Sequence, residues 1–185
     1  MTLPVPEYIA AIEPYVPGKP IEALEREYGI RDSIKLASNE NPLGPSPRAV
    51  QALQGALRDI HRYPDGGGWR LTRKLAEHLG VTPECIVLGN GSDEIIAMLA
   101  RMLLQPGDEV ILPRPSFLMY DICVRCAGSK PVFVDLKGLA MDLAAMGRRI
   151  NEKTRLVFVC NPNNPTGAMT PRKDFDAFME DRKSV

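Results

Sequence analysis

The sequence lacks an excess of charge of either sign. Lys and Arg together number 23, as do Asp and Glu, so the 185-residue chain has no formal net charge at pH 7. Because polyanion-binding domains carry a basic surplus, nothing here suggests a nucleic-acid partner. No stretch approaches the roughly 18 consecutive apolar residues of a membrane span. The first residues show no basic segment followed by an apolar one, so we expect a cytoplasmic protein with no membrane partner.

Metal-binding side chains are also scarce. The chain has two histidines and four cysteines. Cys123 and Cys126 form a C-x-x-C pair that shares one face of a helix expected at 116–127, but no second pair and no histidine lie near it. A zinc or redox site is therefore the minor alternative to buried thiols. Cys85 and Cys160 lie beside or inside expected strands, where a small core residue is the simplest reading.

What the chain does have, from about residue 85, is a regular alternation of apolar runs and helix-like segments. The runs predict strands at 85–88, 109–112, 131–134 and 155–160. The segments between and after them predict helices at 92–104, 116–127, 143–150 and 171–181, the last with Thr170 as its N-cap. Repeated βα units with continuously apolar strands predict an α/β fold, with a mostly parallel sheet covered by helices on both faces.

The first part of the chain is less regular. We expect short helices at 4–13 and 21–28, a strand at 34–36, and helices at 47–60 and 70–79, the last closed by Gly80. Residues 1–35 are therefore read as an N-terminal arm, and residues 36–185 as a large domain. Because the alternation stops at a helix with no strand after it, we expect this domain to be incomplete.

Three turns between an expected strand and the next helix offer chemistry. Gly91-Ser92-Asp93 would expose free N–H groups to a phosphate, although an ordinary first helical turn explains the same residues. Phe117 could stack on a planar ring or simply join the core. In Asn161 to Gly167, two prolines and a glycine stop the strand, so an amide side chain held there could donate to a ligand oxygen.

The carboxyl ends of parallel strands meet at one edge of a sheet, where ligands bind in open α/β folds. Together the three turns therefore describe a site for a planar, phosphorylated ring that carries an oxygen. A nicotinamide-binding site fits poorly, because Gly89-Asn90-Gly91 lacks the third glycine of G-x-G-x-x-G.

The chain resembles the N-terminal half of the histidinol-phosphate aminotransferases, which are fold-type I pyridoxal-phosphate (PLP) enzymes. The matching motifs follow the family's order: Pro14-Tyr15-Val16-Pro17-Gly18-Lys19-Pro20, Lys35 to Gly44, Arg62 to Gly66, Gly89 to Glu94, Pro115-Ser116-Phe117 and Asn161 to Gly167. The first two favour this family over other class I and II aminotransferases. The resemblance implies a truncated fold-type I large domain with a short N-terminal arm, and PLP as cofactor.

The resemblance also implies roles for eight residues. Those that would bind the cofactor are Gly91, Ser92 and Asp93 (phosphate), Phe117 (ring stacking), Asn164 (donor to the phenolic oxygen) and Tyr63 (phosphate of the neighbouring subunit of a homodimer). Those that would contact the substrate are Tyr15 and Asn41. For both tyrosines, packing beneath a loop is the alternative.

The implied reaction moves an amino group between glutamate and imidazole-acetol phosphate in histidine biosynthesis. In the family, a Schiff-base lysine, an aspartate for the pyridinium nitrogen and a substrate-binding arginine all lie beyond the segments matched here. No catalytic residue is therefore assigned in this chain, and we expect it to be inactive alone. The alternatives are another class I or II aminotransferase, a threonine-phosphate decarboxylase, and a non-catalytic remnant.

Overall fold

The computed structural model describes residues 4–180 and divides into two compact units. The first unit joins the N-terminal segment up to Tyr15 to the chain from Leu88 onward. The second unit is Val16–Val87. The boundary expected after residue 35 falls inside the second unit and stays a prediction.

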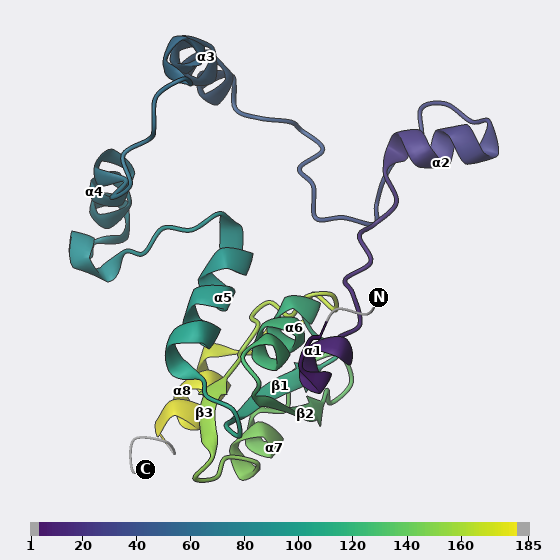
Figure 1. Ribbon diagram of the computed structural model, residues 1–185, viewed down its shortest axis with the longest axis vertical. Coiled ribbons are helices and arrows are strands. Elements are labelled where there is room, and N and C mark those ends of the chain that lie inside the picture. Colours follow the sequence, from purple (N-terminus) through teal and green to yellow (C-terminus); the bar gives the residue numbers. More distant parts are fainter. Residues whose placement is uncertain (1–3, 181–185) are drawn as a thin grey trace. The chain divides into compact units, whose positions relative to one another are not determined.

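A three-stranded parallel sheet in the order β2-β1-β3 forms the centre of the first unit (Figure 1). The strands are β1 (Glu109–Arg114), β2 (Lys130–Asp135) and β3 (Thr154–Val157). β1 pairs with β2 in unbroken register, and with β3 across one irregularity after Glu109. The expected parallel sheet is confirmed, and its strand ends lie within three residues of the predicted ones.

Helices cover both faces of this sheet. On one face, Val110 and Leu112 of β1 pack with α5 (Gly91–Leu103) and α6 (Leu118–Cys126). On the other, Ile111 packs with α7 (Leu143–Arg148) and α8 (Arg172–Glu180). This alternation follows from the two-residue period of a strand. The short helix α1 (Glu7–Ala10) lies against α6.

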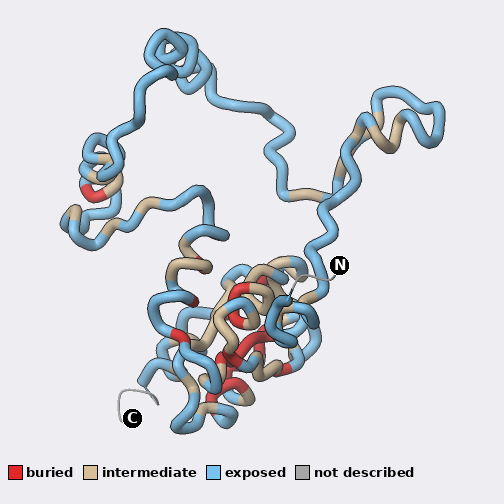
Figure 2. The backbone as a smooth tube through the Cα atoms, in the orientation of Figure 1, coloured by how far each residue is buried: buried red, intermediate tan, exposed pale blue. Residues whose placement is uncertain are grey.

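The second unit consists of short helices with little core. Its elements are α2 (Ile21–Tyr28), α3 (Pro47–Ala56), the 3-10 turn η1 (Leu57–Asp59), α4 (Trp69–Leu79) and the 3-10 turn η2 (Pro83–Cys85). Ala76 is its only buried residue in the described part of the chain (Figure 2). Gly80 ends α4 in the left-handed conformation, as expected of a glycine C-cap. Within residues 4–180, no helix has the length and apolar character to cross a membrane.

Two of the expected strands are wrong. Residues 34–36 form no regular element, and 85–88 begin at the end of η2 and continue without a strand partner. Ile86 has an extended backbone, but a strand also needs a neighbour to complete its hydrogen-bond ladder. Among the described residues the sheet contains only β1, β2 and β3, and neither segment pairs with any of them. The end expected for the last helix at Asp181, and the tail after it, lie outside the described residues.

The buried centre of β1 carries a prediction on stability. Ile111 is fully buried at the middle of the sheet, so Ile111→Ala should lower the free energy of unfolding by about 3 kcal/mol. Met102→Ala is the matched control, because this α5 side chain is 76% exposed and should change stability by less than about 0.5 kcal/mol. Urea denaturation followed by circular dichroism measures both. Equal effects would contradict the assignment of β1 to the core.

Candidate cofactor site

The first expected turn opens α5 with free backbone donors. Gly91, the first residue of the helix, has a φ of 71°, a conformation that would strain any other residue. The side chain of Glu94 accepts a hydrogen bond from the Asn90 N–H at 2.5 Å. The backbone N–H groups of Ser92 and Asp93 have no acceptor among the described residues. The helix N-terminus therefore keeps donors available for an anion.

The turn after β3 is held in place by a residue that the sequence analysis did not single out. Asn163 is 2% exposed, and its side chain makes three hydrogen bonds. Its oxygen accepts from Ser116 Oγ at 2.8 Å, and its nitrogen donates to the Pro115 carbonyl at 3.1 Å and to Thr166 Oγ1 at 3.0 Å. Asn163 thereby ties the turn after β3 to the loop after β1, which leads into Phe117.

Further hydrogen bonds close the same turn. The Gly167 N–H donates to the Asn163 carbonyl at 2.7 Å, and the Asn163 N–H to the Ala168 carbonyl at 2.9 Å. The Asn161 side chain bonds both backbone groups of Thr170, at 2.9 and 3.2 Å. The peptide bonds before Pro115, Pro162 and Pro165 are cis. The hydrogen bonds of Asn161 and Asn163 fix both ends of the turn.

Asn164, the neighbour of Asn163, is bonded differently. Its backbone N–H donates to Cys160 Sγ at 3.4 Å. Its half-buried side-chain amide has no hydrogen-bond partner in the part of the chain that the structure describes. One asparagine therefore builds the turn, while the next leaves a donor and an acceptor available to a ligand.

Phe117 belongs to an aromatic group at the start of α6. It was expected inside the start of a helix at 116–127, but the helix begins one residue after it, at Leu118. Its ring meets Tyr120 edge-on at 5.6 Å between ring centroids. Tyr120 in turn stacks on Phe158 at 4.4 Å. Burial, with a smaller contribution from the Cys160 thiol, raises the pKa of Tyr120 well above its usual range, so its phenol stays neutral.

The remaining three predicted residues are Tyr63, Asn41 and Tyr15. Tyr63 is fully exposed in the second unit. Asn41 lies in the same unit, where its side chain accepts from the Leu43 N–H and donates to the Gly44 carbonyl. Tyr15 is about half exposed, at the end of the N-terminal segment of the first unit. Their contacts with substrate or a neighbouring subunit stay predictions.

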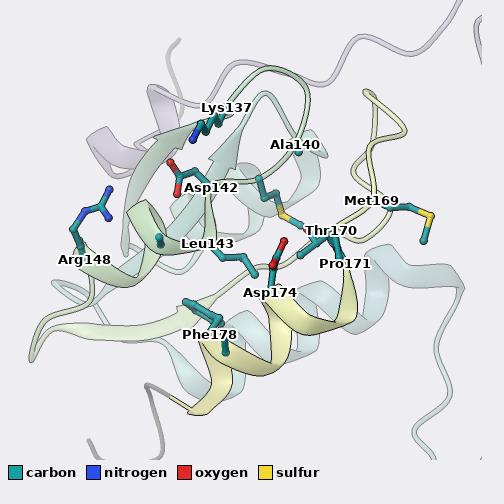
Figure 3. Close-up of a pocket in the computed structure, with 13 residues that line it drawn as sticks. Lys137, Ala140, Asp142, Leu143, Arg148, Met169, Thr170, Pro171, Asp174 and Phe178 are labelled. Carbon is teal, nitrogen blue, oxygen red and sulfur yellow. The ribbon is translucent and has the colours of Figure 1, made fainter.

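The cavity beside Phe117 is small compared with one on the other side of the unit. About 280 Å³ of space lies against Ser116, Phe117 and Tyr120. A larger groove of about 610 Å³ lies between α7 and α8, and none of the predicted site residues lines it (Figure 3). Thr170 borders that groove, but its hydroxyl is buried and has no hydrogen-bond partner among the described residues. The capping bond expected from Thr170 to α8 is therefore absent.

The cysteines differ in part from expectation. Cys123 is buried, as predicted, but Cys126 and Cys85 are exposed, and Cys160 is half-buried. Cys126 is the last residue of α6, and Cys85 lies in a segment that forms no strand. Among residues 4–180, no group of three His, Cys, Asp or Glu side chains could hold a metal ion. Cys160 instead contacts the candidate site.

The chain is similar to known aminotransferases over most of its length. Two curated histidinol-phosphate aminotransferases, from Moorella thermoacetica and Desulfotalea psychrophila, are each 51% identical to this chain, covering 94% and 90% of it but only 45% and 44% of their own lengths. The crystal structure of the Sinorhizobium meliloti histidinol-phosphate aminotransferase, in complex with pyridoxal-5'-phosphate, superimposes with a TM-score of 0.85 at 26% identity, over 98% of this chain and 48% of that one.

The chain therefore spans slightly less than half the length of these relatives. A family model described as aminotransferase class I and II matches residues 31–184, which include the three turns described above. On that match, this chain belongs to the class I and II aminotransferase family.

Proposed function

We propose that this chain supplies the cofactor-facing half of a PLP-dependent histidinol-phosphate aminotransferase. In this proposal the complete enzyme exchanges an amino group between glutamate and imidazole-acetol phosphate. The observation that carries the proposal is the unpartnered Asn164 amide, presented by a turn that Asn163 locks to the loop before Phe117. The identity to curated histidinol-phosphate aminotransferases supports the choice of substrate.

The residues present fit the chemical features of PLP. The free N–H groups of Ser92 and Asp93 suit its phosphate, whose charge the dipole of α5 also favours. The half-buried ring of Phe117 would contact the pyridine face. The Asn164 amide would donate to the phenolic oxygen and hold the ring in one orientation. When bound, PLP would supply the electron-withdrawing ring on which transamination depends.

We further propose that the chain is inactive alone. Several lysines are held in surface ion pairs, namely Lys19, Lys35, Lys74 and Lys130. No lysine in the described part of the chain lines the cavity beside Phe117. Without a lysine at that place, the covalent attachment and the proton transfer of transamination have no residue to perform them.

The outer edge of β3 is where we propose that the rest of such an enzyme packs. No strand covers this edge among the described residues. Beside it lies a groove of about 710 Å³ whose walls come from β3 and α8 and include Leu156, Val157, Phe175 and Met179. An unpaired strand edge beside apolar side chains favours addition of another strand. The homodimer and the cytoplasmic location stay predictions.

Complementation tests the proposed function. The chain would be mixed with a polypeptide that carries the part of the Moorella thermoacetica relative beyond its match to this chain. We expect transamination of histidinol phosphate with 2-oxoglutarate by the mixture, and none by either piece alone. Turnover of threonine phosphate instead would identify a decarboxylase. A mixture that assembles but acts on neither substrate would favour the non-catalytic remnant.

A further inference from the structure

We propose that Cys160 is a positioning residue for the cofactor donor: its thiol fixes the backbone of Asn164 and links that residue, through Tyr120, to the aromatic ring of Phe117. This inference rests on the proposed function only where it concerns PLP. The contacts that Cys160 makes belong to the chain itself and are testable without a cofactor.

The thiol bridges the turn that carries Asn164. Cys160 Sγ accepts a hydrogen bond from the Asn164 N–H at 3.4 Å and donates to the Pro162 carbonyl at 3.6 Å. The Asn164 N–H has no other acceptor among residues 4–180. Cys160, three residues after the end of β3, therefore holds the backbone of Asn164, whose side-chain amide is free for a ligand.

Aromatic contacts connect the Cys160 segment to Phe117. The Tyr120 ring stacks on Phe158, two residues before Cys160, and the nearby Cys160 thiol helps to raise the pKa of the Tyr120 phenol. The same ring meets Phe117 edge-on, with an interplanar angle of 89°. Tyr120 thus contacts Phe117, and through Phe158 it is connected to the segment that ends in Cys160. A displacement of Cys160 would therefore change the position of the Phe117 ring as well as that of the Asn164 backbone.

This role differs from that of Asn163. Asn163 attaches the whole turn to the loop after β1, so its loss affects the folded structure. Cys160 bonds two backbone groups, those of Pro162 and Asn164, inside a turn that remains closed by the Asn163 and Asn161 bonds. Its removal should therefore leave the fold intact while loosening Asn164. A cysteine that merely fills space would show no effect at Asn164 beyond a small loss of stability.

Amide hydrogen exchange of Asn164, measured by NMR on the chain without cofactor, is the first test. Cys160→Ala removes the acceptor, so exchange at Asn164 should rise by about tenfold, while exchange in β1 stays unchanged. Cys160→Ser keeps a donor and acceptor, so it should restore most of the protection. Cys126→Ala, an exposed cysteine on α6, is the matched control. Unchanged exchange at Asn164 in Cys160→Ala would overturn the inference.

Titration with PLP itself is the second test. Cys160→Ala should weaken PLP binding by about fivefold, Cys160→Ser should restore it, and Tyr120→Phe should weaken it less, because the ring contacts remain. If Asn164→Ala weakens PLP binding and Cys160→Ala does not, the positioning role is wrong although the proposed function stands. If neither Asn164→Ala nor Phe117→Ala changes the response to PLP, the proposed function fails, whatever the exchange data show.

Discussion

Asn163→Ala should destabilise the chain far more than Asn164→Ala, although the two residues are identical in type and adjacent. The first substitution removes three hydrogen bonds from a side chain that is 2% exposed, and it leaves Ser116 Oγ without its acceptor. At about 1 kcal/mol for each bond, the free energy of unfolding should fall by about 3 kcal/mol. Asn164→Ala removes no side-chain hydrogen bond within the described chain and should cost less than about 0.5 kcal/mol.

Parallel denaturant titrations of the two variants measure this difference. Ser116→Ala provides a further control, because it removes only one of the three side-chain hydrogen bonds of Asn163, so its stability should lie between those of the wild type and Asn163→Ala. Equal stability of the two alanine variants would show that the Asn163 bonds do not hold the turn.

Asn164→Ala should have its large effect on catalysis instead. In an enzyme completed by the second half of a relative, loss of one preorganised donor to a charged oxygen should lower kcat by about 100-fold. The absorption spectrum of bound PLP should shift, because the phenolic oxygen loses its hydrogen bond. Thr166→Val removes the bond to the Leu139 carbonyl and the bond from Asn163 but keeps the Asn164 amide, so it shows how much loosening of the turn alone lowers the rate. An Asn164→Ala enzyme with the parent rate and spectrum would place the turn away from the ring.

The alternation of apolar runs and helix-like segments was enough to predict the parallel sheet and its two helical layers. β1, β2 and β3 all arise from apolar runs bounded by glycine, proline or charged residues, which are local signals. The run at 85–88 has the same local character but forms no strand, because pairing depends on a neighbour that local pattern does not specify.

In the candidate site, too, the sequence predicted what depends on local pattern and missed what depends on tertiary contacts. Motif resemblance singled out Asn164, but nothing in the sequence distinguished the structural role of Asn163 from the ligand-binding role that we propose for its neighbour. That difference comes from the approach of the loop after β1, which supplies Pro115 and Ser116 as partners. Cys160 was expected to be an ordinary core residue, and only its distances to Asn164 and Pro162 reveal its contacts. The alternation of side chains along a strand predicts which residues are buried, but it does not predict their hydrogen-bond partners.

The most direct test of the account is a titration of the purified chain with PLP, followed by borohydride reduction and peptide mapping. We propose that this chain provides the phosphate, ring and oxygen contacts and that the covalent lysine lies outside it. The proposal therefore predicts NMR shifts at Ser92, Phe117 and Asn164 with no lysine specifically modified. A reducible absorption band that maps to one lysine of this chain would contradict the proposal, because that lysine would then provide the covalent attachment itself.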